Sequence, residues 1–412
     1  MEDANHPKSQ EIPFSQLSCN GMENAKRKKA GLFLNFPEDL LCDILLRLPL
    51  SSLLRFKAVN RCWHSLISSH GFAIGHLNYQ ANNAEPSPRK YGVIQVSNIP
   101  QQQLPRLSLY MHRKAEEEDS DVLIVQTVGF PNPLLLLEDF KNINDSQVFG
   151  SCNGLLLLGH GKNPKRFILW NPSTGQDKEL PLNHFCECPT TFMAGLGYDS
   201  FSDNYKVLAA VNDGGSQLTY VAVYNLKTNS WAMLEKTVFP YEFSSDSSQP
   251  GITLANGAPH WVLKRRGTGH VANVIIYFDL VQENFKELPL PGRLVGAKNV
   301  FLGACKGSLC VGSLWPVNSQ IWIMNQYGVK ESWTMLMLIP GASSTYSILN
   351  FQHLMSMQFP KKSIVLMILD GNSAALFKNK VKESNSFSFS GCQEGLIITA
   401  YMESLISPNN YG

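Results

Sequence analysis

Residues 34–66 read LNFPEDLLCDILLRLPLSSLLRFKAVNRCWHSL, a stretch unlike the rest of the chain. Pro37 can occupy the first turn of a helix, where its missing N–H costs nothing, and Pro49 cannot continue a helix. Between these two prolines, apolar residues follow the i, i+1, i+4, i+5, i+8 spacing of one helical face: Leu40, Leu41, Ile44, Leu45 and Leu48. This spacing predicts a first short helix.

Two further short helices are expected in the same region. Ser51 or Ser52 can cap a second helix, and Asn60 can cap a third. In the third helix the apolar residues stand at i, i+3 and i+4: Trp63, Leu66 and Ile67. Residues 34–79 are therefore predicted to form a module of three short helices.

This module carries more large apolar side chains than three short helices can hide from water. A module of this size is close to the lower limit for folding alone. Each fully buried Leu or Ile would gain roughly 1.5–3 kcal/mol. The excess indicates an apolar face that is completed by a partner.

The composition divides the chain into four parts. Residues 1–33 are polar and irregular and are expected to form a disordered leader. Within the leader, residues 25–30 (AKRKKA) read either as a nuclear localisation signal or as a solvated basic stretch. Residues 34–79 are the helical module, and residues 80–89 form a polar, proline-bearing linker. From 90 to 408, short apolar runs alternate with turn residues, which predicts an all-β domain.

One unit recurs in the all-β part: a strand that ends in Asn or Asp, a tight turn, and a strand with an aromatic residue or Leu-Pro. Trp170, Tyr224 and Phe278 mark three copies at intervals of 54 residues, and Trp322 and Leu369 mark two more. Asn-Gly or Lys-Gly pairs precede several copies and fit the turns between inner strands. An all-β repeat with a period near 50 indicates kelch-like propeller blades, roughly six or seven of them.

The composition also excludes several classes of function. A net charge of +2 over 412 residues gives no field that would attract nucleic acid. The chain contains no run of 18 apolar residues, so no membrane span is predicted. The nine scattered cysteines suggest reduced thiols in an intracellular protein. His184, Cys186 and Cys188 lack a second ligand pair with metal-site spacing, so no metal site is predicted.

Residues 34–66 resemble an F-box. Phe36 replaces the usual Leu before the first proline, and Asn60 replaces a frequent Cys. The features that carry the resemblance are Leu-Leu and Ile-Leu in the first helix, Leu-Pro at 48–49, Leu-x-Arg-Phe at 53–56 and Val-x-x-x-Trp at 59–63.

The remainder resembles the F-box-associated domain of the large plant F-box/kelch-repeat group. The matching motifs are GSCNGL at 150–155, LWNPST at 169–174, GYD at 197–199 with YKV at 205–207, and ESL at 403–405. These motifs neither select nor exclude the S-locus pollen F-box proteins. The expected fold is an α+β multidomain protein, with a three-helix F-box followed by an all-β, kelch-like propeller.

The resemblance implies the substrate-recognition subunit of a Skp–cullin–F-box ubiquitin ligase. The F-box would dock on a Skp-type adaptor, and through it on a cullin and a RING protein, while the propeller would hold an unknown target protein. Such a subunit is not an enzyme and needs no cofactor, because it contributes proximity. The adaptor-facing residues, some of which must instead form the module's own core, are drawn from Phe36, Pro37, Leu40, Leu41, Ile44, Leu48, Pro49, Leu53, Leu54, Val59, Trp63 and Leu66.

Two alternatives stay open. A non-catalytic scaffold would bind the Skp adaptor without joining a cullin. A propeller enzyme would need a ligand constellation that the sequence does not display. Target binding is expected in the loops at residues 183–191, 211–216, 241–249 and 264–270, and the protein is expected in the nucleus and/or the cytoplasm.

Overall fold

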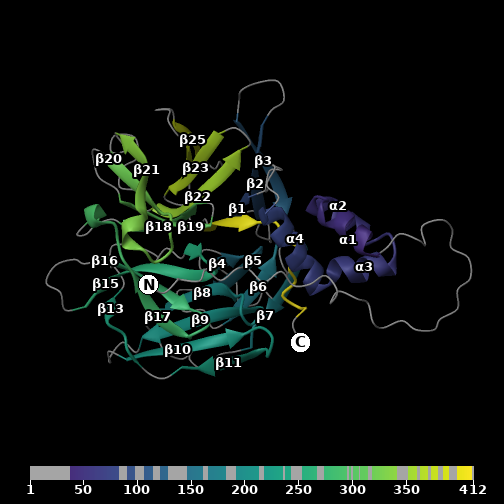
Figure 1. Ribbon diagram of the computed structural model, residues 1–412, viewed down its shortest axis with the longest axis horizontal. Helices are drawn as coiled ribbons and strands as arrows, with labels where there is room; N and C mark the ends of the chain where they lie inside the picture. Colours follow the sequence, from purple (N-terminus) through teal and green to yellow (C-terminus); the bar gives the residue numbers. More distant parts are fainter. Residues whose placement is uncertain are drawn as a thin grey trace, which may run out of the picture. The chain divides into compact units, whose positions relative to one another are not determined.

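The computed structural model (Figure 1) describes residues 38–82, 91–97, 106–114, 121–128, 146–160, 166–181, 192–212, 218–234, 237–242, 253–266, 273–294, 297, 300–305, 307–313, 318–340, 351–359, 362–369, 373–378, 384–388 and 397–410. The chain divides into two compact units, Met1–Asn83 and Ala84–Gly412. Helices form the first unit and strands dominate the second, which confirms the predicted order. Among the described residues, no helix is long and apolar enough to cross a membrane.

The described residues 38–82 of the first unit, called here the helical unit, form four helices where the sequence predicted three. They are α1 (Glu38–Leu46), α2 (Leu50–Phe56), α3 (Arg61–Ser68) and α4 (His70–Asn82). The sequence of α4, HGFAIGHLNYQAN, contains two glycines, which disfavour a helix, and its apolar residues do not gather on one face. The fourth helix therefore left no periodic signal in the sequence.

The starts of α2 and α3 test two predicted caps. The Oδ1 of Asn60 accepts a hydrogen bond from the N–H of Trp63 at 2.8 Å, which confirms the predicted cap of α3. The prediction that Ser51 or Ser52 caps α2 is wrong, because both serines lie inside its first turn. Pro49 occupies the N-cap position instead and makes no side-chain capping bond.

A small apolar core joins the four helices. Leu45, Leu53 and Ile67 are fully buried within it. The Nε2 of the buried His76 lies 3.0 Å from the carbonyl oxygen of Leu48 and ties α4 to the turn between α1 and α2. Burial lowers the pKa of His76 and the bond to Leu48 opposes that shift, so the neutral ring donates this hydrogen bond.

The described strands of the second unit form antiparallel meanders of four strands, here called blades, and blades 3 and 4 each add a short fifth strand. Blade 1 contains β26 (Ile397–Met402), β1 (Tyr91–Ser97), β2 (Arg106–Lys114) and β3 (Asp121–Val128). Blade 2 contains β4 (Ser146–Cys152), β5 (Leu155–His160), β6 (Phe167–Asn171) and β7 (Gln176–Glu179). Blade 3 contains β8 (Phe192–Asp199), β9 (Asn204–Asn212), β10 (Leu218–Asn225) and β11 (Ser230–Met233), with β12 (Thr237–Val238) paired to β10.

The remaining blades follow the same plan. In blade 4, β13 (Tyr241–Glu242) and β14 (Thr253–Ala255) both pair with β15 (Ala258–Arg265), followed by β16 (Asn273–Asp279), β17 (Asn284–Leu288) and the short helix η4 (Gly292–Leu294). Blade 5 contains β18 (Val300–Cys305), β19 (Ser308–Ser313), β20 (Asn318–Met324) and β21 (Trp333–Pro340), with η5 (Lys330–Ser332) before β21. Blade 6 contains β22 (Phe351–Phe359), β23 (Lys362–Leu369), β24 (Ser373–Lys378) and β25 (Ser384–Ser388).

The blades close into a ring. Four of the five hydrogen-bonded sheets hold one blade each, and the eight-stranded sheet holds two, so the described strands make six blades. Successive blades are in contact through the strand pairs β26 and β4, β4 and β8, β8 and β15, β14 and β18, β18 and β22, and finally β22 and β26. β26 pairs antiparallel with β1, from Tyr91 opposite Met402 to Val96 opposite Ile397. The last strand of the chain thus completes the first blade of a β-propeller.

The motifs at 150–155, 169–174 and 403–405 meet in one place. The Nδ2 of Asn171, at the end of β6, donates to the carbonyl oxygens of Ser404 (3.0 Å) and Ile406 (2.6 Å). Gly154 has φ +85° in the β4–β5 turn, and a Cβ there would lie 2.2 Å from the Oγ of Ser404. Only glycine fits this position, so the three motifs anchor the C-terminal segment against blade 2.

The repeat has two variants, one with Leu-Pro and one with Trp. The Trp of one blade donates a hydrogen bond to the carbonyl of the Pro that follows the preceding blade. The indole N–H of Trp231 in blade 3 donates to the carbonyl of Pro181, which follows the last strand of blade 2, at 2.8 Å. Trp333 in blade 5 donates in the same way to Pro289, which follows the last strand of blade 4, again at 2.8 Å. The indole of each of these two tryptophans therefore joins one blade to the preceding one.

Candidate functional site

The helical unit exposes a second apolar face in addition to its core. Leu40 and Ile44, four residues apart on α1, are 50% and 49% exposed. Val59, in the turn between α2 and α3, is also exposed. The opposite side of α1 already supplies Cys42 and Leu45 to the core. Large apolar side chains at i and i+4 that no core residue covers indicate a surface for another protein.

The structure sorts the twelve residues that the sequence placed against an adaptor. Exposed residues are Leu40, Ile44, Pro49 and Val59; half-buried residues are Leu41, Leu48, Leu54, Trp63 and Leu66; Leu53 is fully buried. Phe36 and Pro37 lie outside the described residues. Leu53 thus belongs to the core of the unit, whereas the first two groups have side-chain surface that a partner can reach.

An aromatic contact between α2 and α3 lies next to this surface. The rings of Phe56 and Trp63 meet edge to face, with centroids 5.3 Å apart. Nearby, the guanidinium of Arg55 donates to the carbonyl of Ser51 and the hydroxyl of Ser52, both at 3.3 Å. Burial lowers the pKa of Lys57 at the end of α2. Of these contacts, the one between Phe56 and Trp63 joins α2 to α3 across the turn that carries the exposed Val59.

In the part of the chain that the structure describes, no group of three His, Cys, Asp or Glu side chains could hold a metal ion. His184, Cys186 and Cys188 lie outside that part. Sequence reasoning missed α4 and its His76, which fixes the α1–α2 turn. A lone histidine in a glycine-containing stretch gave no signal for that role.

The loops predicted to bind a target lie largely outside the described residues. Residues 183–191 are entirely outside, and of the other three loops the structure describes only residues 211–212, 241–242 and 264–266. Target binding by these loops therefore stays a prediction.

Two family models match the two units. The F-box domain model matches residues 33–74. The model of the F-box associated beta propeller domain matches residues 109–408, most of the chain. Each match falls on the unit with the corresponding architecture: helices in the first and blades in the second.

Relatives support the same assignment. The F-box/kelch-repeat protein At3g23880 of Arabidopsis thaliana is 30% identical over 91% of this chain and 96% of its own length. The F-box protein CPR1 of the same plant is 26% identical over 90% of this chain and 88% of its own length. TolB from Acinetobacter baumannii, a solved structure, matches 81% of this chain and 73% of its own at 12% identity and a TM-score of 0.39, too low to carry an argument. The chain belongs to the family of F-box proteins that carry an F-box-associated β-propeller domain.

Proposed function

We propose that this protein is the substrate-recognition subunit of a Skp–cullin–F-box ubiquitin ligase. The helical unit docks on a Skp-type adaptor, which connects it to a cullin and a RING protein. The propeller binds a target protein, whose identity is open. The chain itself is not an enzyme and uses no cofactor, and it works in the nucleus and/or the cytoplasm.

The observation that carries this proposal is the pair of exposed side chains on α1. Leu40 and Ile44 face solvent although the helical unit has few residues with which to build a core. Such a unit gains stability when a partner covers these side chains, because each buried Leu or Ile contributes roughly 1.5–3 kcal/mol. The match to the F-box model over residues 33–74 makes a Skp-type adaptor the expected partner.

In this proposal the protein accelerates ubiquitination by proximity alone. Holding the target and the charged conjugating enzyme on one scaffold turns their encounter into an intramolecular event with a high effective concentration. A closed propeller suits this role, because its ring of inner strands gives the target a stable platform.

Co-purification with a plant Skp-type adaptor tests the proposal. The wild-type chain should bind, and the double variant Leu40→Asp/Ile44→Asp should lose binding by about 30-fold or more, because two carboxylates would be desolvated in an apolar interface. The matched control is Met335→Asp/Leu338→Asp on β21, where both residues are 48% exposed. The control should bind the adaptor like the wild type.

Failure of the wild-type chain to bind the adaptor would contradict the proposal. Equal loss in both double variants would also contradict it, since the effect would then not be specific to α1. Addition of cullin and RING protein to the purified complex separates a ligase subunit from a scaffold that never joins a cullin.

A further inference from the structure

Two turns of the propeller share one sequence pattern and one geometry. Residues 199–204 read DSFSDN and residues 279–284 read DLVQEN. They connect β8 to β9 in blade 3 and β16 to β17 in blade 4. Both have an Asp first, an apolar residue third, an acidic residue fifth and an Asn last. The acidic residues, Asp203 and Glu283, adopt left-handed backbone angles of φ +51° and +52°.

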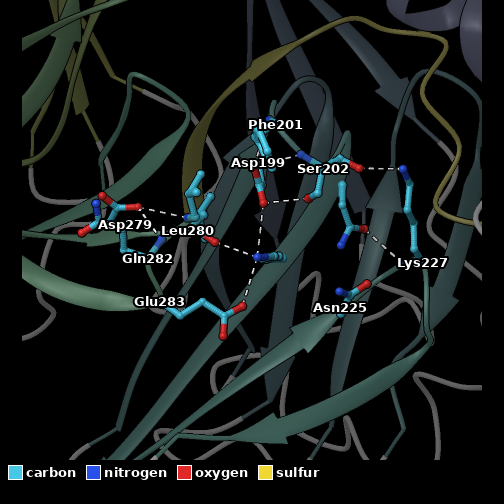
Figure 2. Close-up of polar contacts among 12 residues, drawn as sticks. Asp199, Phe201, Ser202, Asn225, Lys227, Asp279, Leu280, Gln282 and Glu283 are labelled. Atoms are coloured by element: carbon cyan, nitrogen blue, oxygen red, sulfur yellow. Dashed lines mark hydrogen bonds and ion pairs between the residues drawn. The ribbon is translucent and has the colours of Figure 1, made fainter.

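Hydrogen bonds hold the first turn in a fixed shape. The Oδ1 of Asp199 accepts from the backbone N–H groups of Phe201 (3.0 Å) and Ser202 (3.3 Å), and its Oδ2 accepts from the hydroxyl of Ser202 (2.7 Å). From blade 3's outer turn, the Nζ of Lys227 donates to the carbonyl of Ser202 at 2.7 Å. Figure 2 shows these contacts around Asp199 and Ser202.

The second turn repeats this arrangement. The Oδ1 of Asp279 accepts from the N–H groups of Val281 (3.0 Å) and Gln282 (2.9 Å). The Nζ of Lys286 lies 2.5 Å from the other carboxylate oxygen, Oδ2. The Asp side chain in each turn thus fixes the backbone that carries the apolar residue.

One buried lysine joins the two turns. The Nζ of Lys206 donates to the carbonyl of Leu280 (2.6 Å) and lies 3.0 Å from Glu283 Oε1 and 3.2 Å from Asp199 Oδ2. Figure 2 shows dashed contacts from Asp199, Leu280 and Glu283 converging on this nitrogen. Because Lys206 contacts both turns, the positions of their apolar residues are fixed relative to each other.

These fixed turns present apolar side chains to solvent. Phe201 is 88% exposed and Val281 is 58% exposed. The fold of such a turn does not require an apolar side chain at its third position. In the turns that begin at Asn171 and Asn225, that position is held by Ser173 and Lys227. Rigidly held apolar groups are the kind that anchor a partner, because little conformational freedom is lost on binding.

The two turns carry one carboxylate more than the number of lysines paired with them: Asp199, Asp203, Asp279 and Glu283 against Lys206, Lys227 and Lys286. The side chains of Asp203 and Glu283 are 44% and 35% exposed. Two lysines face these carboxylates. Lys206 is buried, and Lys227 lies 3.8 Å from Asp203 and also donates a hydrogen bond to a backbone carbonyl. Lys286 is paired with Asp279. A basic partner segment would complement this excess of one negative charge, and a cation also interacts favourably with the face of an exposed phenyl ring such as that of Phe201.

We propose that these two turns form a docking surface for a segment of another protein that combines apolar with basic side chains. Phe201 and Val281 take the apolar groups, while Asp203 and Glu283 take the basic ones. That this partner is the ubiquitination target rests on the proposed function. Antiparallel strands reverse direction at each turn, so successive turns of a blade lie at opposite edges of it. The two docking turns therefore lie at one edge of blades 3 and 4, and the strand ends that flank the predicted target loops lie at the other edge.

A random dodecapeptide library displayed on phage tests the surface on the full-length chain. Peptides are first selected for binding to the wild-type chain. The binding of the selected peptides to the double variant Phe201→Ser/Val281→Ser is then measured. The matched control, Met233→Ser/Met335→Ser, changes exposed apolar residues on the outer strands β11 and β21. A class of peptides that pairs apolar residues with Lys or Arg should bind the wild type and control at least tenfold more tightly than the Phe201/Val281 variant.

Two further readouts complete the test. Asp203→Asn/Glu283→Gln should weaken the selected peptides at least fivefold and reduce the salt dependence of their binding. Selection of no such class, or of neutral or acidic peptides, would overturn the docking surface. The Phe201/Val281 variant should keep its binding to the Skp-type adaptor. Peptide binding by a chain that fails to bind the adaptor would support the surface and remove only the ligase role.

Discussion

An exposed apolar helix face marks the helical unit, whereas buried polar side chains join neighbouring blades of the propeller. In the helical unit, α1 exposes Leu40 and Ile44 although its other face already packs in the core. The propeller instead buries polar side chains and gives them partners from distant parts of the chain. Lys206 reaches Leu280, and the Nε2 of His260 lies 2.7 Å from the Oη of Tyr327. The helical unit leaves an apolar surface for a second protein, whereas the propeller supplies the partners of these buried groups itself.

Two buried polar groups of the propeller, the ammonium of Lys206 and the indole N–H of Trp333, lie where blades meet. Lys206 joins blades 3 and 4, and the indole of Trp333 joins blades 4 and 5. A buried polar group that loses its partner costs about 1–3 kcal/mol, and a buried charge costs more. Substitutions at these joints should therefore lower stability without changing adaptor binding, and substitutions of the exposed residues on α1 should do the reverse.

The largest effect on stability is expected for Lys206→Met. The side chain of Asp199 would remain buried without its cation, which should lower the free energy of unfolding of the propeller by about 3–5 kcal/mol. Chemical denaturation followed by tryptophan fluorescence measures this loss. The control is Lys227→Met, whose pair with Asp203 is exposed at 3.8 Å and should contribute less than about 1 kcal/mol.

Equal losses in the two lysine variants would show that burial of Lys206 adds nothing to the joint. Adaptor binding provides the second measurement. It should stay at the wild-type level in both variants at temperatures where both are folded.

The next effect separates core from surface within the helical unit. Leu53→Ala removes a fully buried side chain and should cost about 2–5 kcal/mol of the unit's stability. Leu40→Ala, at a half-exposed position on α1, should cost less than about 1 kcal/mol yet weaken adaptor binding. Hydrogen exchange of the helical amides and adaptor titration measure the two quantities. A larger stability loss for Leu40→Ala than for Leu53→Ala would reverse the assignment of core and surface.

This distinction between core and surface was beyond the reach of the sequence. The spacing of Leu40, Ile44 and Leu45 correctly predicted a helix over α1. Because apolar residues occupy two adjacent faces, however, periodicity alone could not say which face is covered. Leu53 and Leu54 present the same ambiguity on α2, where the structure buries the first fully and the second only partly.

The propeller was predictable from its repeats, except at its closure. The Trp170, Tyr224 and Phe278 copies fall on β6, β10 and β16, the third strands of three successive blades. Among the described residues, the region from 90 to 145 holds three strands of blade 1, and β26 supplies the fourth. No local pattern reveals a pairing between segments separated by nearly the whole domain. The donor and acceptor roles of the Trp and Leu-Pro variants likewise required their positions in space.

The smallest effect is expected at the joint between blades 4 and 5. Trp333→Phe keeps a ring in place but removes the indole N–H that donates to Pro289, and should cost about 1 kcal/mol more than Trp322→Phe. Trp322 is the matched control because its indole donates only to Gln320, two residues away in the same blade, at 3.3 Å. Thermal unfolding of both variants measures the difference. If the two variants melt alike, the indole contact between blades adds no stability, and the ring would depend on apolar packing at this joint.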